Sequence, residues 1–279
     1  MSFRKEVIEH LGKYKKEVLE IEEKGIFIYR KRKIPLHHIL PKKDIEHNII
    51  LPYQEEFNKL RQEGLKLHRY FHHLNSSQAL CINLFLPLIL DKRLDIVLDV
   101  LGIENNKVIN SCFEKESELE KVGLKDRKTN FDFFIECSKK IFFEIKYTER
   151  EFGKAKKDGS HKEKFIKTYQ PLLRVNGYIK QEYKGVDSFL NYYQIMRNLV
   201  HINSNSFVVF LYPEANKNVH DQAEESRNFL TDKGKDRFKI LLLERIIDGI
   251  MKRIKTEKKL LEHYKAFKLK YIKIIKQLN

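Results

Sequence analysis

The pattern of apolar and polar positions changes near residue 100. Before that point, apolar residues recur every three or four positions, which is the period of an amphipathic helix. We predict helices over residues 6–24 and around residues 52–74, with a basic, Pro-containing loop at residues 30–43 between them. A further helix starts after Asn75-Ser76, because Asn and Ser are favoured N-caps. The first hundred residues are therefore predicted to be mainly helical.

Beyond residue 100, short runs of β-branched and aromatic residues predict strands. The predicted strands are residues 108–113, 131–136, 141–147, 206–212 and 237–243. Helices are predicted over residues 189–201 and 221–230 and from Glu244 onward, and the polar, Lys-rich residues 151–188 predict a loop followed by one or two helical turns. The order β–β–β–α–β–α–β–α predicts a mixed sheet with helices on its faces.

The segment FDFFIECSKKIFFEIKYTE places three charged side chains among apolar ones. A hairpin centred near residue 138 sets Asp132 opposite Glu144, and strand alternation puts Glu144 and Lys146 on one face. Charges inside apolar strands are costly unless they are paired or bound to metal, and a divalent cation removes the repulsion between two carboxylates. The pattern predicts a Mg²⁺ site, with Mn²⁺ as the alternative, at Asp132, Glu144 and the Ile145 carbonyl. Lys146 would hold or activate the attacking water.

A plainer interpretation of the same pattern stays open. A half-exposed hairpin with a Lys–Glu pair on its solvent-exposed face would show the same alternation. This alternative leaves unexplained the many Phe residues that flank the charges.

The net charge of the chain indicates what kind of partner it binds. The chain has 55 Lys and Arg against 39 Asp and Glu, a net charge of +16, and such an excess favours nucleic acid as a partner. Residues 233–279 carry fifteen of the basic and only five of the acidic residues. Three uses of this basic, amphipathic segment stay open: contact with the DNA backbone, a dimer seam, or an acidic membrane surface, the last being least favoured.

Further sequence patterns, most of them absent, exclude several classes of protein. No stretch is apolar and long enough to span a bilayer, no apolar signal core is present, and the three cysteines form no CxxC pair. We therefore expect a reduced, cytoplasmic protein without membrane contact. A Gly-rich phosphate loop, a GxSxG elbow and zinc-finger spacing are all missing, which argues against an ATP-driven enzyme or a serine hydrolase. His68, His72 and His73 lack an HExxH pattern and are interpreted as surface or DNA-facing residues.

The spacing Asp132-x11-Glu144-x-Lys146 resembles the PD-(D/E)XK nuclease superfamily, although Phe131 stands where that family usually has Pro. The segments NFDFF, FFEIKYTEREFGKA, YYQIMRNLVH and FVVFLYP more narrowly resemble a set of bacterial restriction endonucleases. The resemblance covers about residues 75–245. It implies an α/β (α+β) chain with a restriction-endonuclease-like αβββαβ core and a mixed sheet.

The resemblance also implies further site residues. An acid is expected before the hairpin, and Glu114 is favoured over Glu118. On the helix after the hairpin, Gln194 would orient Lys146, and Arg197, on the same helix face, would clamp a phosphate. The residues assigned to DNA binding are Arg197, Lys154, Lys156 and Lys157.

These observations combine into one functional hypothesis. We expect a mainly helical region at residues 1–100, a nuclease core at residues 101–245 and a basic helical extension at residues 246–279. The predicted activity is Mg²⁺-dependent cleavage of double-stranded DNA by a type II restriction-like endonuclease, acting as a homodimer because two strands are cut. The alternatives are a structure-specific repair or RNA nuclease of the same superfamily and a non-catalytic DNA-binding module.

Overall fold

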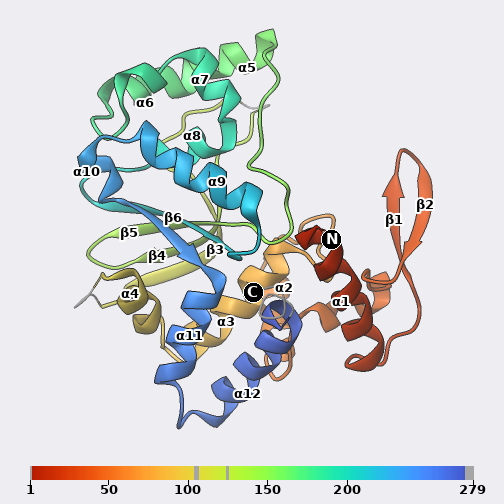
Figure 1. The fold of residues 1–279 in the computed structure, drawn as a ribbon. Helices are drawn as coiled ribbons and strands as arrows, with labels where there is room; N and C mark the ends of the chain where they lie inside the picture. Colours follow the sequence, from red (N-terminus) through yellow and green to blue (C-terminus); the bar gives the residue numbers. More distant parts are fainter. Residues whose placement is uncertain (1, 104–106, 124–125, 274–279) are drawn as a thin grey trace.

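A five-stranded mixed sheet forms the centre of the molecule. The computed structural model describes residues 2–103, 107–123 and 126–273. The strands lie in the order β3–β4–β5–β6–β7 (Figure 1). Their bounds are β3 Asn110–Glu116, β4 Asn130–Glu136, β5 Lys140–Ile145, β6 Ser206–Tyr212 and β7 Phe238–Leu242. The pairs β3–β4 and β4–β5 are antiparallel, whereas β5–β6 and β6–β7 are parallel.

Helices cover both faces of this sheet (Figure 1). One face packs in a single apolar cluster with α1 Phe3–Glu17, α3 Ser77–Leu90, α4 Asp95–Leu101, α11 Leu243–Arg253 and α12 Lys258–Phe267. The other face packs with the π-helical turn η2 Phe165–Tyr169 and with α6 Gln170–Val175, α7 Val186–Asn191, α8 Tyr193–Leu199 and α9 Lys217–Glu225. The sheet is therefore a buried middle layer, and its strands carry apolar side chains toward both sides.

The predicted fold class is confirmed. The order α3–β3–β4–β5–α8–β6 gives the αβββαβ arrangement of a restriction-endonuclease-like α+β core. The side chain of Ser76 caps α3 by accepting a hydrogen bond from the Ala79 N–H, as the sequence predicted. The predicted helix at residues 189–201 is interrupted at Tyr192, where α7 gives way to α8.

Residues 151–188 contain more helix than was predicted. A continuous helical run, α5 Gly159–Lys164, η2 and α6, follows the polar loop. Phe165, Tyr169 and Leu173 recur every four residues along this run and are buried in the sheet-facing cluster. The stripe was missed because the segment as a whole is polar, and Lys167, Thr168 and Gln170 stand between the members of the stripe.

The N-terminal region departs furthest from prediction. The predicted loop at residues 30–43 is wrong, because β1 Gly25–Tyr29 and β2 Arg32–Leu36 form an antiparallel hairpin there. Pro35 is compatible with β2 because this two-stranded sheet has open edges. The predicted helix at residues 52–74 is shorter, since α2 Gln54–Gln62 ends just before Gly64, which adopts φ +106°.

The basic C-terminal segment is part of the core. Helices α11 and α12 and the π-helical turn η5 Lys268–Ile272 bury their apolar sides in the cluster that contains α3. The His263 side chain hydrogen-bonds the Asn83 carbonyl of α3 at 2.7 Å, and His10 of α1 hydrogen-bonds the Leu269 carbonyl at 2.9 Å. The division into three regions stays a prediction, but both ends of the described chain close one shared core.

The short elements complete the chain. They are η1 Lys42–Asn48, η3 Gln181–Tyr183, η4 Ser226–Phe229 and α10 Asp232–Lys235. Within the described part of the chain, every helix is too short or too polar to traverse a bilayer.

Candidate active site

The β4–β5 hairpin has the register that the sequence predicted. Phe133 pairs with Phe143 and Phe134 with Phe142, which centres the hairpin on residue 138. Asp132 lies one position beyond this ladder, and its Oδ2 accepts a 2.6 Å hydrogen bond from the Ile145 N–H. The Asp132 carboxylate is therefore fixed at the carboxyl end of β5, beside Glu144.

Glu144 and Lys146 form a buried ion pair. Lys146 Nζ donates to Glu144 Oε1 at 2.8 Å, and the two side chains are only 10% and 5% exposed, respectively. This burial contradicts the alternative of a Lys–Glu pair on a wet sheet face. A buried pair of this kind needs further hydrogen bonds to offset the loss of hydration.

Helix α8 supplies those hydrogen bonds. Gln194 Nε2 donates to Glu144 Oε1 at 2.6 Å, and Asn198 Nδ2 donates to Oε2 at 2.9 Å. The Gln194 Oε1 also accepts a 2.9 Å bond from the Gly153 N–H, so Gln194 links the loop after β5 to the site. Asn198 was missed by the sequence analysis, although its position one helical turn after Gln194 was the available signal.

Arg197 lies with a different set of partners. Its Nε donates to Thr129 Oγ1 at 3.0 Å, its Nη2 is 3.9 Å from buried Glu120, and its guanidinium lies over the Tyr193 ring. Asn198 therefore joins Gln194 at Glu144, whereas Arg197 lies with Thr129 and Glu120. The assignment of Arg197 to DNA binding stays a prediction.

Of the two candidate upstream acids, Glu114 is the one near Asp132. Glu114 adopts a left-handed backbone conformation, φ 54°, between positions that pair with the two neighbours of Asp132. Its carboxylate accepts a 2.7 Å bond from Gln78 Nε2 and lies 3.3 Å from His68 Nε2. The bond to Glu114 raises the pKa of His68. His68 and Gln78 were not predicted as neighbours of the site.

Glu118 lies elsewhere. It pairs with Lys115 and Lys140, and these two lysines lower its pKa to about 2. The pair with Lys140 places Glu118 at the opposite end of β5 from Lys146.

The surroundings of the site favour the charged form of Lys146 but not that of Asp132. Burial, followed by the adjacent Glu144 carboxylate, raises the pKa of Asp132 well above its usual value. Burial lowers the pKa of Lys146, but the carboxylates of Glu144, Glu149 and Asp132 outweigh this effect, and the net shift is upward. Lys146 therefore carries its charge at neutral pH, whereas ionised Asp132 is disfavoured unless positive charge is added nearby.

The donors at this site are hard oxygens. Within residues 2–103, 107–123 and 126–273, no three His, Cys, Asp or Glu side chains are grouped to hold a metal ion. The Asp132 and Glu144 carboxylates with the Ile145 carbonyl form a smaller set. Mg²⁺ commonly binds through one or two carboxylates and retains several waters, so the chemistry of this donor set fits Mg²⁺. Glu144 would exchange one of its present hydrogen bonds for the ion.

The loop after β5 carries the predicted DNA-binding lysines on its surface. Lys154, Lys156 and Lys157 are exposed, with Lys154 paired to Glu151 and Lys157 lying 3.7 Å from Asp187. Their assignment to DNA binding stays a prediction.

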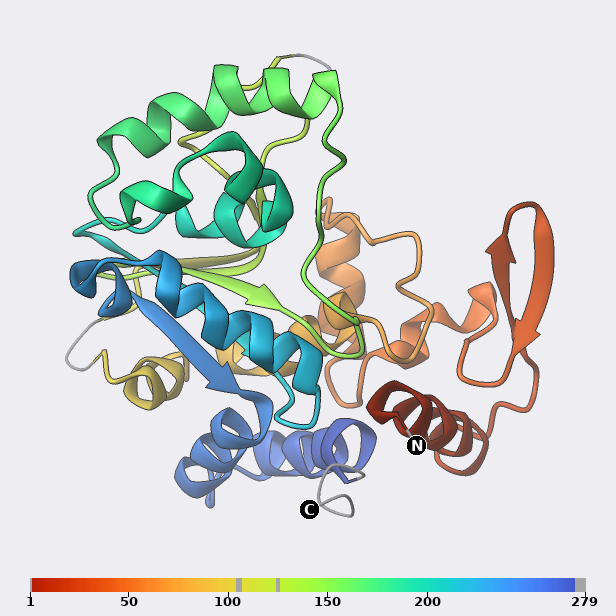
Figure 2. The same ribbon diagram turned by 45° about the horizontal axis from the view of Figure 1, so that its top comes forward.

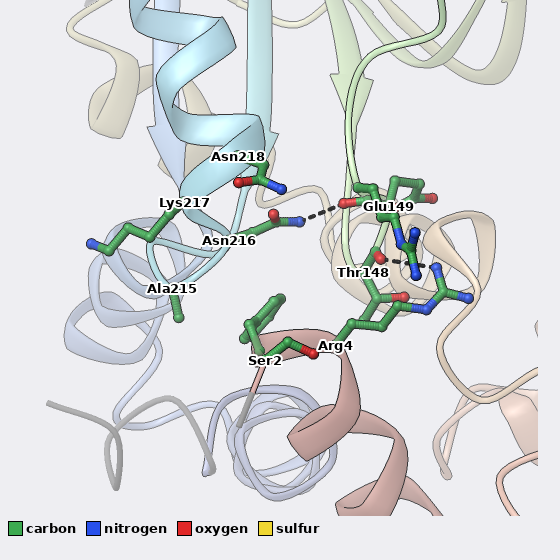
Figure 3. A pocket seen from close by; sticks show the side chains of 10 residues that line it. Ser2, Arg4, Thr148, Glu149, Ala215, Asn216, Lys217 and Asn218 are labelled. Atoms are coloured by element: carbon green, nitrogen blue, oxygen red, sulfur yellow. Dashed lines mark hydrogen bonds between the residues drawn. The ribbon is translucent and has the colours of Figure 1, made fainter.

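A pocket of about 430 Å³ opens where this loop begins, between α1 and α9 (Figure 3). Arg4 donates to the Thr148 carbonyl at 3.3 Å, and Asn216 Nδ2 donates to the Glu149 carbonyl at 2.9 Å. Arg150 and Lys217 also line the pocket. No local sequence pattern indicates this pocket, because its walls come from segments far apart in the chain.

The αβββαβ fold and an Asp–Glu–Lys group at the end of its third core strand define a restriction-endonuclease-like protein. Residues 8–272 match the family described as "Restriction Endonuclease associating with ARP", and the chain belongs to this family. A nuclease-like function follows from that membership, and DNA is the substrate that the family implies. Searches of curated proteins and of solved structures found no match.

Proposed function

We propose that this protein is a Mg²⁺-dependent endonuclease of the PD-(D/E)XK superfamily that hydrolyses phosphodiester bonds of double-stranded DNA. The observation that carries the proposal is the buried Glu144–Lys146 pair beside Asp132 at the end of β5. A buried acid–base group of this kind is costly to a fold and is commonly found at functional sites. Mn²⁺ is the alternative metal.

The residues divide into holding and activating roles. Asp132 and Glu144, with the Ile145 carbonyl, would hold Mg²⁺, with Glu114 beside them. When bound, Mg²⁺ supplies positive charge that polarises the scissile phosphate. Lys146 carries three N–H donors at the same carboxylate and would orient the attacking water and offset the charge that develops on the phosphate.

Gln194 and Asn198 act through Glu144. Their two hydrogen bonds fix the plane of the Glu144 carboxylate, so that one oxygen remains directed toward Lys146. They are positioning residues in this proposal, which revises the predicted role of Gln194 as a partner of Lys146. Preorganisation of this sort removes the cost of reorienting groups during the reaction.

Three further parts of the hypothesis belong to the same proposal. The net charge of +16 supports binding through phosphate contacts, with Lys154, Lys156, Lys157 and Arg197 as contributors. Cleavage of both strands requires two active sites, for which a two-fold homodimer is the economical arrangement. We place this activity in the cytoplasm, where the DNA substrate lies.

Cleavage of supercoiled plasmid and phage DNA tests the proposal. We expect cleavage with Mg²⁺ and none with EDTA, and we expect Asp132→Ala and Glu144→Ala to abolish cleavage while DNA binding persists. Glu118→Ala is the matched control, because it removes an acid that lies away from the site, and it should cleave normally. Full activity of either site variant would contradict the assignment. Cleavage restricted to branched DNA or to RNA would support the repair or RNA nuclease instead.

A further inference from the structure

The β1–β2 hairpin projects from the body of the molecule (Figures 1 and 2). Its strands pair from Gly25–Leu36 at the base to Tyr29–Arg32 at the tip. The ring contacts described for Phe27 tie the lower half of the hairpin to Tyr70 and His73, with ring centroids 5.8 Å apart in both cases. The distal half, from Ile28 to Lys33, is exposed.

Four consecutive cations occupy the tip. Arg30, Lys31, Arg32 and Lys33 are all exposed, and among the residues that the structure describes none of them lies in an ion pair. The acids at the base of the hairpin are already neutralised, Glu22 by Lys16 and Glu23 by Lys43. The tip therefore presents positive charge that the protein itself does not offset.

The turn conformation places two of these cations at the point of the hairpin. Arg30 and Lys31 adopt φ 44° and 69°, the positive values of a two-residue type I′ turn. Asn-Gly is the favoured sequence in such turns, because long side chains adopt positive φ at a cost. Two long cations therefore occupy turn positions in which Asn-Gly would be more stable. We interpret this cost as an indication that the positive charge at the turn has a function.

The base of the hairpin is close to the candidate active site. His68 lies 3.3 Å from Glu114, and Tyr70, two residues later in the chain, contacts Phe27 of β1. Since two residues span at most about 7 Å, the Phe27 ring and the Glu114 carboxylate are separated by a distance on the order of 20 Å. A DNA duplex that occupies the active site is therefore within reach of the hairpin.

We propose that the β1–β2 hairpin enters the major groove of the duplex and reads base edges there, with Arg30 and Arg32 as the reading side chains. The inference rests on the proposed function. Five strand residues extend roughly 16 Å, and the major groove, about 12 Å wide and 8.5 Å deep, admits a two-stranded ribbon. Arg, like Lys, donates to the O6 and N7 of guanine, and the planar guanidinium presents two donors to them at once.

The features of the strands favour DNA over a protein partner. An exposed strand edge invites pairing with another chain, and Lys and Pro on the edge prevent such pairing. Lys33 and Pro35 occupy β2, the outer strand of the hairpin in Figures 1 and 2. A groove lined by phosphates, in contrast, complements all four cations of the tip.

The double variant Arg30→Asn/Lys31→Gly tests the inference. It removes two charges but supplies the favoured turn sequence, so the hairpin should keep its conformation and the melting temperature should not fall. We expect affinity for duplex DNA to drop roughly 10- to 100-fold. We also expect guanines that the wild-type protein protects from N7 methylation by dimethyl sulfate to become reactive.

The control variant Lys92→Gln/Lys107→Gln removes two exposed charges that flank α4, outside the basic segment of residues 233–279; α4 lies across the molecule from the hairpin (Figure 1). Its affinity should stay near that of the wild-type protein. Wild-type affinity of the hairpin variant, or unchanged guanine protection, would overturn the inference. An equal loss on duplex RNA would overturn it too, since side chains cannot read the deep major groove of RNA. A hairpin variant that loses dimerisation instead of guanine contacts would likewise contradict it.

A second variant and a binding assay without cleavage distinguish failure of the hairpin inference from misfolding and from failure of the proposed function. If the turn variant melts early, Arg32→Gln/Lys33→Gln, which leaves the turn sequence intact, takes its place with the same expected losses. Binding and methylation protection are measured without cleavage. A wild-type protein that binds DNA but never cuts it would therefore refute the proposed function while the hairpin is still judged by its own data.

Discussion

Two buried lysines, Lys146 and Lys270, have opposite electrostatic surroundings, although the residues that follow them, Tyr147 and Tyr271, are in contact. Lys146 faces Glu144, with Asp132 and Glu149 nearby, and the net effect of its surroundings raises its pKa. Lys270, on η5, is fully buried, and within the part of the chain that the structure describes its Nζ donates to the carbonyl and the side-chain oxygen of Asn48, at 2.6 and 2.8 Å. Burial lowers the pKa of Lys270 well below its usual value.

The difference shows that burial alone does not decide in which direction the pKa of a lysine shifts. Both ammonium groups lose hydration, but only Lys146 has carboxylates to replace it. The pKa of Lys146 is raised, so this group stays charged at neutral pH, as a group that stabilises a phosphate must. Burial disfavours the charged form of Lys270, which acts as a structural donor to Asn48. The comparison makes one lysine a candidate for chemistry and the other a part of the core.

The largest expected effect follows from Lys146→Ala. The cleavage rate should fall by about 10² to 10⁴-fold, because acid–base and electrostatic groups contribute on that scale. Stability should fall by about 1–3 kcal/mol, since the buried Glu144 loses one partner but keeps Gln194 and Asn198. This exceeds the effect expected for an exposed pair. Cleavage rate and unfolding free energy should be measured on one preparation; an active, folded variant would remove Lys146 from the mechanism.

Lys270→Met should lower the stability of the protein but leave the cleavage rate unchanged. Met retains an unbranched apolar side chain but leaves Asn48 Oδ1 without its described donor, so stability should fall by about 1–3 kcal/mol. The cleavage rate per folded molecule should match the wild-type protein. A loss of cleavage without a loss of stability would break the comparison.

The same variant should alter the pH dependence of stability. Because the folded pKa of Lys270 is lowered, the unfolded state binds more protons below the usual pKa of lysine, and this contribution makes unfolding harder as pH rises. In the pH range just below the usual pKa of lysine, the Lys270→Met protein should lack this increase, which is at most roughly 1.4 kcal/mol per pH unit for one proton. Lys146, whose pKa is raised, contributes no slope in that window. Denaturant titrations at three pH values measure the difference.

The smallest expected effect on stability is that of Asp132→Asn. The folded pKa of Asp132 is raised, so its ionisation above the unfolded value near 3.9 costs stability as pH rises. Without metal, the variant should therefore be more stable at neutral pH by about 1–2 kcal/mol, or a few degrees in Tm. Mg²⁺ should raise the Tm of the wild-type protein but not of the variant. The exposed control Asp187→Asn should change neither value, and a destabilised Asp132→Asn would contradict the sign.

The hairpin at the site was predictable because its information is local. Phe and Ile alternate with charges along residues 131–147, and the polar turn between the strands sets their register. Asp132, Glu144 and Lys146 could therefore be placed together before any long-range contact was known. The buried strand β6 carried an equally local signal in its unbroken apolar run.

The rest of the site depends on contacts between distant segments. Gln78 and His68 reach Glu114 only because α3 packs behind β4, and no sequence pattern joins residues 68, 78 and 114. Arg197 and Asn198 are adjacent in sequence, and the rotation of α8 on the sheet decides which of them faces Glu144. The β1–β2 hairpin was missed because charged turn residues replace the Asn-Gly signal.

The closure of the core by both ends of the chain has a consequence for synthesis. Asn83 of α3, the helix that supports β4 and β5, donates to the Tyr271 hydroxyl and accepts from His263. Residues 260–272 must therefore emerge before the layer behind the hairpin can close. At about 5–20 residues per second, translation reaches them only after tens of seconds. We expect a growing chain to remain without a finished catalytic site throughout that interval.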